Sequence, residues 1–224
     1  MRQLLSYTSF GLLVLAGCEP RPPEKPAPVF NQQCDYMLVA VVDVTGSYLD
    51  ILEKRGFPLL LATCDQYFSA RVGANDRLVI ARVSGSERAL LWDGPPMALR
   101  ESFASPAAFR AFLEKNAGGG SRVYDSVADA TTYCLDFPGV AHEKTCVMVL
   151  SDMEDNFPDS AQSKARMLNA LSAYAKKGGS VGFYFVGQAE VTGLRQDLAK
   201  CGFKHPPVVE SEIVVSPALP TFGE

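Results

Sequence analysis

The feature that most constrains this chain is an uninterrupted apolar run, residues 37–42 (MLVAVV), that ends on Asp43. The run is rich in valine and does not alternate with polar residues, which is typical of a strand buried on both faces of a parallel sheet. Such strands lie in the middle of α/β folds. Asp43 would then stand at the carboxyl end of its strand, where ligands collect in open α/β sheets.

A second run of the same kind, residues 146–150 (CVMVL), ends on Ser151 and Asp152. The rest of the chain alternates short apolar segments with segments of helical periodicity. Strands are predicted at residues 37–42, 77–83, 89–93, 146–150, 181–186 and 208–215, and helices at about residues 47–72, 107–116, 123–135, 161–177 and 192–201. The periodicity of the helix at 161–177 places on one face Ala165, Leu168, Leu171 and Ala175.

These elements predict an α/β fold, with a doubly wound, mostly parallel six-stranded sheet and helices on both faces, as in Rossmann-like proteins. The turn at residues 84–87 joins two strands in a hairpin, so the strand at 89–93 is expected to be antiparallel and to lie at one edge. If the strands follow the common order 3-2-1-4-5-6, Asp43 and Asp152 end neighbouring strands and face one crevice.

The N-terminal residues carry the features of a targeting segment. Residues 1–17 begin with a positive charge and contain an apolar run too short to span a bilayer, which predicts a secretory signal peptide. Residues 15–18 (LAGC) resemble the bacterial lipobox, which implies that Cys18 is lipidated and anchors the chain to a membrane. The alternatives are an ordinary cleaved signal or a buried strand with an incidental cysteine. Glu19, rather than Asp, follows the cysteine, and by resemblance to Gram-negative lipoproteins this favours the periplasmic side of the outer membrane in the cell envelope.

A proline-rich segment follows, with prolines at positions 20, 22, 23, 26 and 28. It is expected to act as a semi-rigid spacer of about 3.1 Å per residue; recruitment of a recognition domain through its PxxP pattern is the weaker alternative. The predicted organisation is therefore a signal peptide (1–17), a lipid anchor and linker (18–33), a folded domain (34–216) and a C-terminal tail (217–224).

The amino-acid composition indicates a single folded core and limits the classes of molecule that the chain can bind. At 224 residues and 47% hydrophobic content, the chain can bury one sizeable core. The formal net charge of -4 and the scattered Lys and Arg residues argue against nucleic acid as a partner.

The cysteines and histidines suggest no redox or catalytic centre. Without Cys18, five cysteines remain, an odd number that leaves at least one free in an oxidising compartment. Cys146, which begins a buried strand, is expected to be a free packed thiol, and pairings such as Cys34 with Cys201 or Cys64 with Cys134 stay open. His142 and His205 are expected to be exposed loop residues.

Oxygen-bearing side chains gather at the predicted strand ends. Asp43 and Asp152 supply carboxylates, Thr45 and Ser47 supply hydroxyls from the turn after the first strand, and Ser121 follows the glycines at 118–120. A site of hard oxygen ligands without histidine or thiolate suits Mg²⁺, with Mn²⁺ and Ca²⁺ as alternatives, and disfavours Zn²⁺ and copper.

Three short motifs resemble those of von Willebrand factor type A domains. Residues 43–47 (DVTGS) resemble the DxSxS signature, residues 119–125 (GGSRVYD) the GGT loop, and residues 150–156 (LSDMEDN) the (T/S)DGxDN segment, in the family's order across about residues 35–215. The resemblance implies a metal-ion-dependent adhesion site. Its ion, usually Mg²⁺, binds the three hydroxyls, while the two aspartates act largely through bound water, and a carboxylate of a protein ligand often completes the coordination.

The chain departs from the family pattern at three positions. Thr45 stands where Ser is usual, Ser121 where Thr is usual, and Met153 where Gly commonly follows the last aspartate. The first two changes keep the oxygen atom. The alternative without metal binding is a degenerate site whose Ser, Thr and Asp residues only cap helices. The acidic residues nearby are expected either to form a solvated loop or to tune the ion: Asp125, Glu154, Asp155 and Asp159.

Three functions follow from this interpretation. The leading one is a lipid-anchored binding module that captures a protein through the ion, and it is not an enzyme. A hydrolase using the ion, Ser47 or Ser121 is the rival from another class, but no histidine accompanies these serines and GxSxG is absent. The third is a structural envelope component with a lapsed metal site.

Overall fold

A computed structural model describes residues 33–45, 48–71, 74–83, 90–117, 120–155 and 157–223. All of them belong to one compact unit that spans residues 32–224. The predicted signal peptide, Cys18 and residues 18–32 of the predicted linker lie outside the described residues, and so does Ser47.

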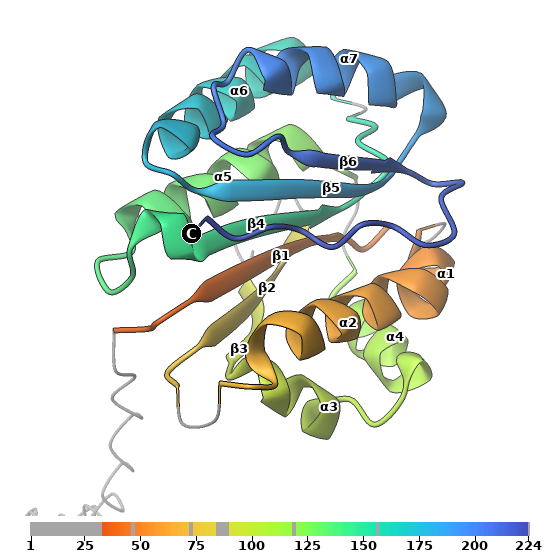
Figure 1. Cartoon of the computed structure of the whole chain (residues 1–224). Helices are drawn as coiled ribbons and strands as arrows, with labels where there is room; N and C mark the ends of the chain where they lie inside the picture. The colour runs from red at the N-terminus through yellow and green to blue at the C-terminus, as the bar shows by residue number, and fades with distance from the viewer. Residues whose placement is uncertain are drawn as a thin grey trace, which may run out of the picture. The chain divides into compact units, whose positions relative to one another are not determined.

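The centre of the fold is a six-stranded sheet with the strand order β3-β2-β1-β4-β5-β6 (Figure 1). β3 pairs antiparallel with β2, and every other neighbouring pair is parallel. The predicted doubly wound topology, with its antiparallel edge strand, is confirmed. The strands are β1 (Met37–Asp43), β2 (Arg77–Val83), β3 (Leu90–Gly94), β4 (Thr145–Leu150), β5 (Ser180–Val186) and β6 (Val208–Ser211).

Helices cover both faces of this sheet (Figure 1). One face carries α5 (Val123–Asp136), α6 (Ser160–Lys176) and α7 (Gln188–Ala199). The other carries α1 (Leu49–Ile51), the π-helix η1 (Leu52–Gly56), α2 (Phe57–Phe68), the 3₁₀-helix η2 (Pro96–Ala98), α3 (Leu99–Ser102) and α4 (Pro106–Lys115). A further 3₁₀-helix, η3 (His142–Lys144), precedes β4.

The alternation of side chains along β1 explains why the sequence run is apolar throughout. All seven residues of this strand are buried. Successive side chains of a strand point to opposite faces, so one half of the run packs with α5 and α6 and the other half with α2 and α4. A strand flanked by helices on both sides has no face on which a polar residue could reach water.

Pro58 explains the π-turn that interrupts the helix after β1. Its ring removes a backbone donor and excludes the carbonyl four residues earlier from a regular turn. The chain accommodates it with one wider turn, in which the Phe57 amide donates to the Leu52 carbonyl. The predicted helix at residues 47–72 is therefore one helical stretch, Leu49–Phe68, that changes its hydrogen-bond pattern halfway.

Ser105 and Pro106 define the start of α4. The Ser105 hydroxyl accepts a hydrogen bond from the Ala108 amide at 3.1 Å, and Pro106 occupies the first turn, where its missing amide proton costs nothing.

Three predicted boundaries or faces were wrong. On α6, Leu171 and Ala175 are buried as predicted and Leu168 is half-buried, but Ala165 is exposed, and the buried face also carries Ser163, Met167 and Tyr174. The reason is that the large Met167 and Tyr174 side chains decide which stripe of the helix packs, and a small alanine does not. α7 begins at residue 188 rather than 192, and β6 ends at residue 211 rather than 215 because the chain turns there, with the Val214 amide donating to the Ser211 carbonyl at 3.1 Å.

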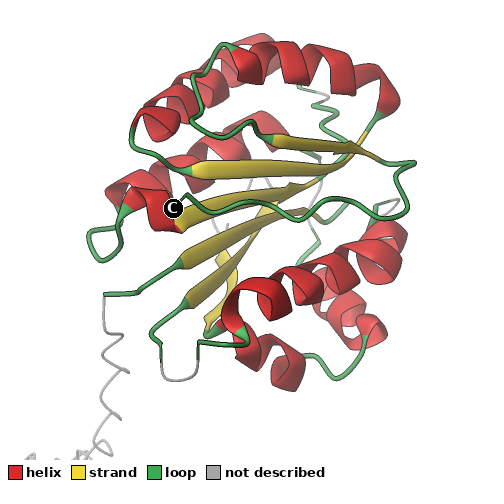
Figure 2. Ribbon diagram, viewed as in Figure 1, coloured by secondary structure: helices red, strands yellow, loops and turns green. Residues whose placement is uncertain are grey.

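Residues 212–223 turn away from β6 and continue without helix or strand (Figure 2). Near its end Phe222 packs edge-on against three rings, with centroid distances of 5.5 Å to Tyr36, 4.9 Å to Tyr67 and 5.8 Å to Phe68. The Tyr67 hydroxyl donates to the Pro220 carbonyl. The segment thus completes the core on the face that α2 covers.

The five cysteines within the described ranges are free thiols, and neither Cys34 with Cys201 nor Cys64 with Cys134 is joined. Cys146 is a buried free thiol, as predicted. His205 is exposed, whereas His142 is half-buried, with Nε2 3.1 Å from the Leu135 carbonyl oxygen, so the prediction for His142 was wrong. Within the described ranges, every helix is too short or too polar to cross a membrane.

Candidate functional site

Asp43 ends β1 at the edge of the sheet where the parallel strands finish, here called the carboxyl edge, which is on the right in Figure 1. Asp43 is only 1% exposed to solvent. The Thr45 amide donates to Asp43 Oδ1 at 3.0 Å and so fixes the turn that follows the strand. A carboxylate is thereby held inside the protein at the predicted position.

Two hydroxyl groups from other loops meet this carboxylate. Ser121 Oγ lies 3.1 Å from Asp43 Oδ2 and 3.3 Å from Oδ1, and Ser151 Oγ lies 3.2 Å from Oδ2. Ser151 in turn accepts the Met153 amide at 3.1 Å. Segments far apart in the sequence, after β1, before α5 and after β4, therefore converge on one buried carboxylate.

Asp152 stands at the end of β4, the neighbour of β1, and is half-buried. Its Oδ1 accepts the Glu154 amide at 2.9 Å, and its backbone carbonyl accepts the Gly187 amide at 2.9 Å. Burial raises the pKa of Asp152, and the negative charges of Asp43, Glu154 and Glu212 raise it further, while the hydrogen bond from the Glu154 amide lowers it. The two predicted carboxylates are thus close enough to repel each other.

No cationic side chain of the described residues forms an ion pair with Asp43 or Asp152. Nor does any group of three or more His, Cys, Asp or Glu side chains, as far as the structure describes the chain, come together as a metal site. Any ion held here would therefore use hydroxyl and water oxygens beside the two carboxylates.

Of the five predicted metal residues, the structure brings Asp43 and Ser121 into direct contact and places Asp152 on the adjoining strand. Thr45 contacts Asp43 through its backbone amide rather than its hydroxyl, and the residue is half-buried. Ser47 lies outside the described residues.

Sequence reasoning missed two residues of this site. Ser151 is fully buried and bonded to Asp43, and the signal for it was a hydroxyl directly after a buried run. Tyr48 is 3% exposed, and its hydroxyl lies 3.4 Å from the Tyr184 carbonyl oxygen. Burial raises the pKa of Tyr48 well above its usual value, and the charges of Asp43 and Asp152 raise it further.

Two backbone conformations support the loops of the site. Gly120, just before Ser121, has φ of +81°, and a Cβ atom there would lie 2.7 Å from Phe157 Cζ, so glycine is required. Met153, just after Asp152, has φ of 68°, a strained value for a side chain of this size. Met153 nevertheless has its side chain packed in the core, 1% exposed, which offsets part of the strain.

Asp155 caps α5. Its carboxylate accepts the amide of Tyr124, in the first turn of α5, at 3.4 Å, where the dipole of the helix favours a negative charge. It also accepts the Phe157 amide of its own loop at 3.2 Å. Asp159 pairs with Arg122 at 3.0 Å. Both carboxylates therefore have structural partners, while Glu154 is exposed.

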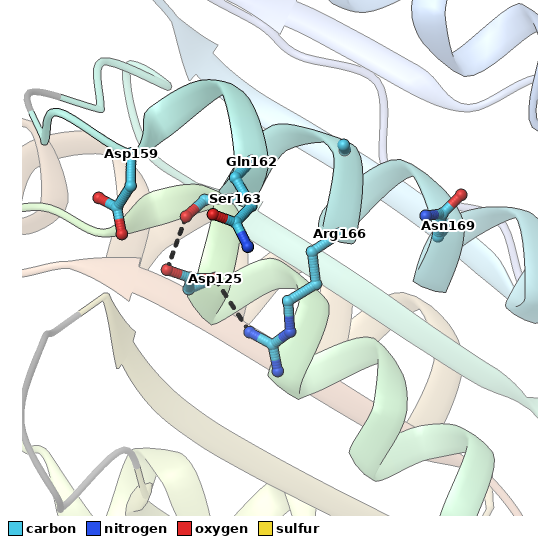
Figure 3. A pocket seen from close by; sticks show the side chains of 7 residues that line it. Asp125, Asp159, Gln162, Ser163, Arg166 and Asn169 are labelled. Atoms are coloured by element: carbon cyan, nitrogen blue, oxygen red, sulfur yellow. Dashed lines mark hydrogen bonds and ion pairs between the residues drawn. The ribbon is translucent and has the colours of Figure 1, made fainter.

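Asp125 lies in a groove between α5 and α6 (Figure 3). It accepts the Ser163 hydroxyl at 2.9 Å and the Arg166 guanidinium at 3.0 Å. Gln162 and Asn169 line the same groove. Because the charge of Asp125 is already paired across the two helices, this carboxylate joins elements rather than serving the site at the carboxyl edge.

Comparison with known proteins identifies the fold and no more. No protein-family model and no curated protein matches the sequence. The pilus adhesin SpaC of Lactobacillus rhamnosus GG, in an open conformation, is similar in structure, with a TM-score of 0.52 and 12% identity over 80% of this chain and 28% of that chain. A manganese-loaded TRAP protein of Plasmodium vivax gives 0.49 and 15%, over 80% and 70%. Proximal thread matrix protein 1 of the mussel byssus gives 0.47 and 11%, over 80% and 44%.

This chain spans about a quarter of the length of SpaC. At such low identity a shared fold does not carry function with it. The common architecture is the six-stranded, mostly parallel α/β sheet that the resemblance to von Willebrand factor type A domains predicted.

Proposed function

We propose that this chain is a binding module that holds a divalent cation at the carboxyl edge of its sheet and captures a protein partner through that ion. The observation that carries the proposal is the Asp43 carboxylate, which is 1% exposed and has no cationic partner among the described residues. A buried charge without a counter-charge is costly, and a cation at this place would supply the missing charge.

The residues present fit Mg²⁺, with Mn²⁺ and Ca²⁺ as alternatives. Asp43, Ser121 and Asp152 would hold the ion together with Thr45 and Ser47, directly or through water. These are hard oxygen ligands, which such ions prefer. When bound, the ion supplies a positive position to which a carboxylate of a partner can be attracted.

The proposal includes a place in the cell. The lipobox-like residues 15–18 and the proline-rich linker support a module tethered through lipid on Cys18, facing the periplasm from the outer membrane. The spacer would hold the binding edge away from the lipid surface.

One observation favours a second candidate function, a structural component whose metal site has lapsed. The hydroxyls of Ser121 and Ser151 and the amide of Thr45 all donate to Asp43. Three donors can satisfy a buried carboxylate without an ion, which is what a structural component with a lapsed metal site would need.

Thermal unfolding of the full chain separates the two. With Mg²⁺ or Mn²⁺ at about 100 times the dissociation constant, the chain should gain about 2.7 kcal/mol over the chain in EDTA. Asp43→Asn should remove this gain. In EDTA the same variant should be at least as stable as the parent, because it removes an uncompensated buried charge.

Asp65→Asn is the matched control, since this carboxylate is partly exposed and pairs with Arg100 between α2 and α3, outside the loops of the site. It should respond to Mg²⁺ as the parent does. Equal melting temperatures of the parent in Mg²⁺, Mn²⁺ and EDTA would refute the metal function and favour the lapsed site.

A further inference from the structure

Two apolar side chains stand in solvent next to the proposed metal centre. Ile213 is 70% and Val215 89% exposed, and both belong to the short segment that follows β6. In Figure 1 this segment lies beside α1 at the carboxyl edge. A single exposed apolar side chain is ordinary, whereas neighbouring ones rimmed by polar residues mark interaction surfaces.

The backbone of this segment is held in place. The Glu212 amide donates to the Val186 carbonyl at 3.0 Å. The guanidinium of Arg55, from the π-turn, donates to the carbonyls of Glu212 and Val214, and it stacks over the Phe185 ring at 4.7 Å. Ile213 and Val215 are therefore presented on a fixed backbone, which lowers the entropy that a partner must remove on binding.

Backbone contacts give the distance from the metal centre. The Gly187 amide is bonded to the Asp152 carbonyl, and the next strand follows through the bond from Glu212 to Val186. Neighbouring strands lie about 4.8 Å apart, so two such steps place Glu212 about 10 Å from Asp152. A specific protein interface covers about 800 Å² on each partner, a disc of about 16 Å radius. A protein centred on the ion would therefore reach Glu212 and the segment that begins there, which carries Ile213 and Val215.

The charges nearby restrict what can lie over the two side chains. Glu154, two residues after Asp152, is exposed, and so is Glu212, which directly precedes Ile213. A second acidic group of the partner would be repelled by these carboxylates, whereas apolar groups would gain contact with Ile213 and Val215.

We propose that residues 212–215 form the apolar half of a docking surface whose other half is the cation. The partner is a protein that presents one carboxylate to the ion and, beside that carboxylate, large apolar side chains that pack on Ile213 and Val215. This inference rests on the proposed function, because it takes the ion as the centre of the interface.

Selection of random 12-residue peptides displayed on phage, with the full chain immobilised in detergent, tests the inference. In Mg²⁺ the parent should select peptides that combine Asp or Glu with a large apolar residue about three positions away, since an extended chain advances about 3.3 Å per residue. A synthetic peptide of the selected sequence should bind the double variant Ile213→Asn, Val215→Asn about tenfold more weakly than the parent.

Met97→Asn is the matched control, because Met97 is also an exposed apolar side chain, 41% exposed, but lies at the opposite edge of the sheet. It belongs to η2, which follows the end of β3 that pairs with the start of β2. This variant should bind the peptide as the parent does. Mg²⁺-dependent acidic peptides without an apolar preference, bound equally by the double variant, would overturn the inference and leave the metal function standing. Failure to select peptides, or peptides held equally in EDTA, would overturn the metal function first.

Two other occupants of the apolar surface have their own readouts. If a second copy of the chain covers it, sedimentation should show a dimer of the parent that the double variant loses. If lipid covers it, vesicles of phosphatidylethanolamine and phosphatidylglycerol should bind the parent more strongly than the double variant when both lack Cys18. Either result would overturn the proposed protein partner.

Discussion

At the scale of single residues, the site depends on where hydroxyl groups are held rather than on how many there are. Ser121 reaches Asp43 because the preceding glycine adopts a left-handed conformation against the Phe157 ring. Arg122, on the other side of Ser121, stacks over the same ring at 4.2 Å. One aromatic side chain therefore fixes both neighbours of Ser121.

Gly120→Ala tests this arrangement. A side chain at φ of +81° costs about 1–2 kcal/mol, and its Cβ would also push against Phe157. We expect lower stability in urea unfolding and a smaller stabilisation by Mg²⁺, since the hydroxyl of Ser121 would be displaced.

Gly193→Ala is the control for this substitution. Gly193 lies within α7, and a Cβ atom added there would meet nothing within 4 Å, so alanine should raise helix stability by up to about 1 kcal/mol. A Gly120→Ala protein that matches the parent in both stability and Mg²⁺ response would show that the loop conformation is not required.

At the scale of elements, α5 and α6 are joined by Asp125. Burial by itself raises the pKa of Asp125, but the hydrogen bonds from Ser163 and Arg166 outweigh it and leave the pKa below its usual value. The folded state therefore favours the ionised carboxylate more than the unfolded chain does. This contribution to stability is complete above the unfolded pKa, about 3.9, and is lost as the pH falls through the lower folded value.

Asp125→Asn should accordingly cost about 1 kcal/mol at pH 7, and the difference from the parent should close as the pH falls below about 4. Urea unfolding between pH 7 and pH 2.5 measures it. Gln162→Ala, at an exposed and uncharged position of the same groove, should show a difference that does not change with pH. A constant gap for Asp125→Asn would contradict the pairing described for this carboxylate.

At the scale of the whole molecule, the sheet separates two cores, and thiols are buried in both. Cys134 packs in the core under α5, and Cys64 and Cys146 pack in the core under α2. Burial raises the pKa of Cys64 and of Cys134 to about 12, so little thiolate is present at pH 8. Their chemical reactivity should therefore report opening of the molecule.

Labelling with a maleimide, followed by mass spectrometry of peptides, measures this reactivity. Half-buried Cys34 should react first, and the buried thiols should react only as fast as the cores open, about tenfold more slowly for each 1.4 kcal/mol of opening free energy. A disulfide-linked pair of peptides from the native chain would contradict the free thiols of the structure.

The sequence by itself determined the sheet and the residues at its carboxyl edge. The runs that end on Asp43 and Asp152 are apolar throughout because helices cover both faces, and this pattern can be read without coordinates. The carboxylate after the first run and the hydroxyl after the glycine loop were also predicted to meet, and Asp43 and Ser121 do meet.

Tertiary structure alone decided the rest. Periodicity placed Ala165 on the buried face of α6 with Leu171 and Ala175, but packing of Met167 and Tyr174 left Ala165 exposed at the edge of that face. The hydrogen bond from the Tyr48 hydroxyl to the Tyr184 carbonyl, and those from Arg55 to the carbonyls of Glu212 and Val214, join segments that are distant in the chain. Local patterns report which face of an element is apolar; they carry no information about which distant segment will lie against it.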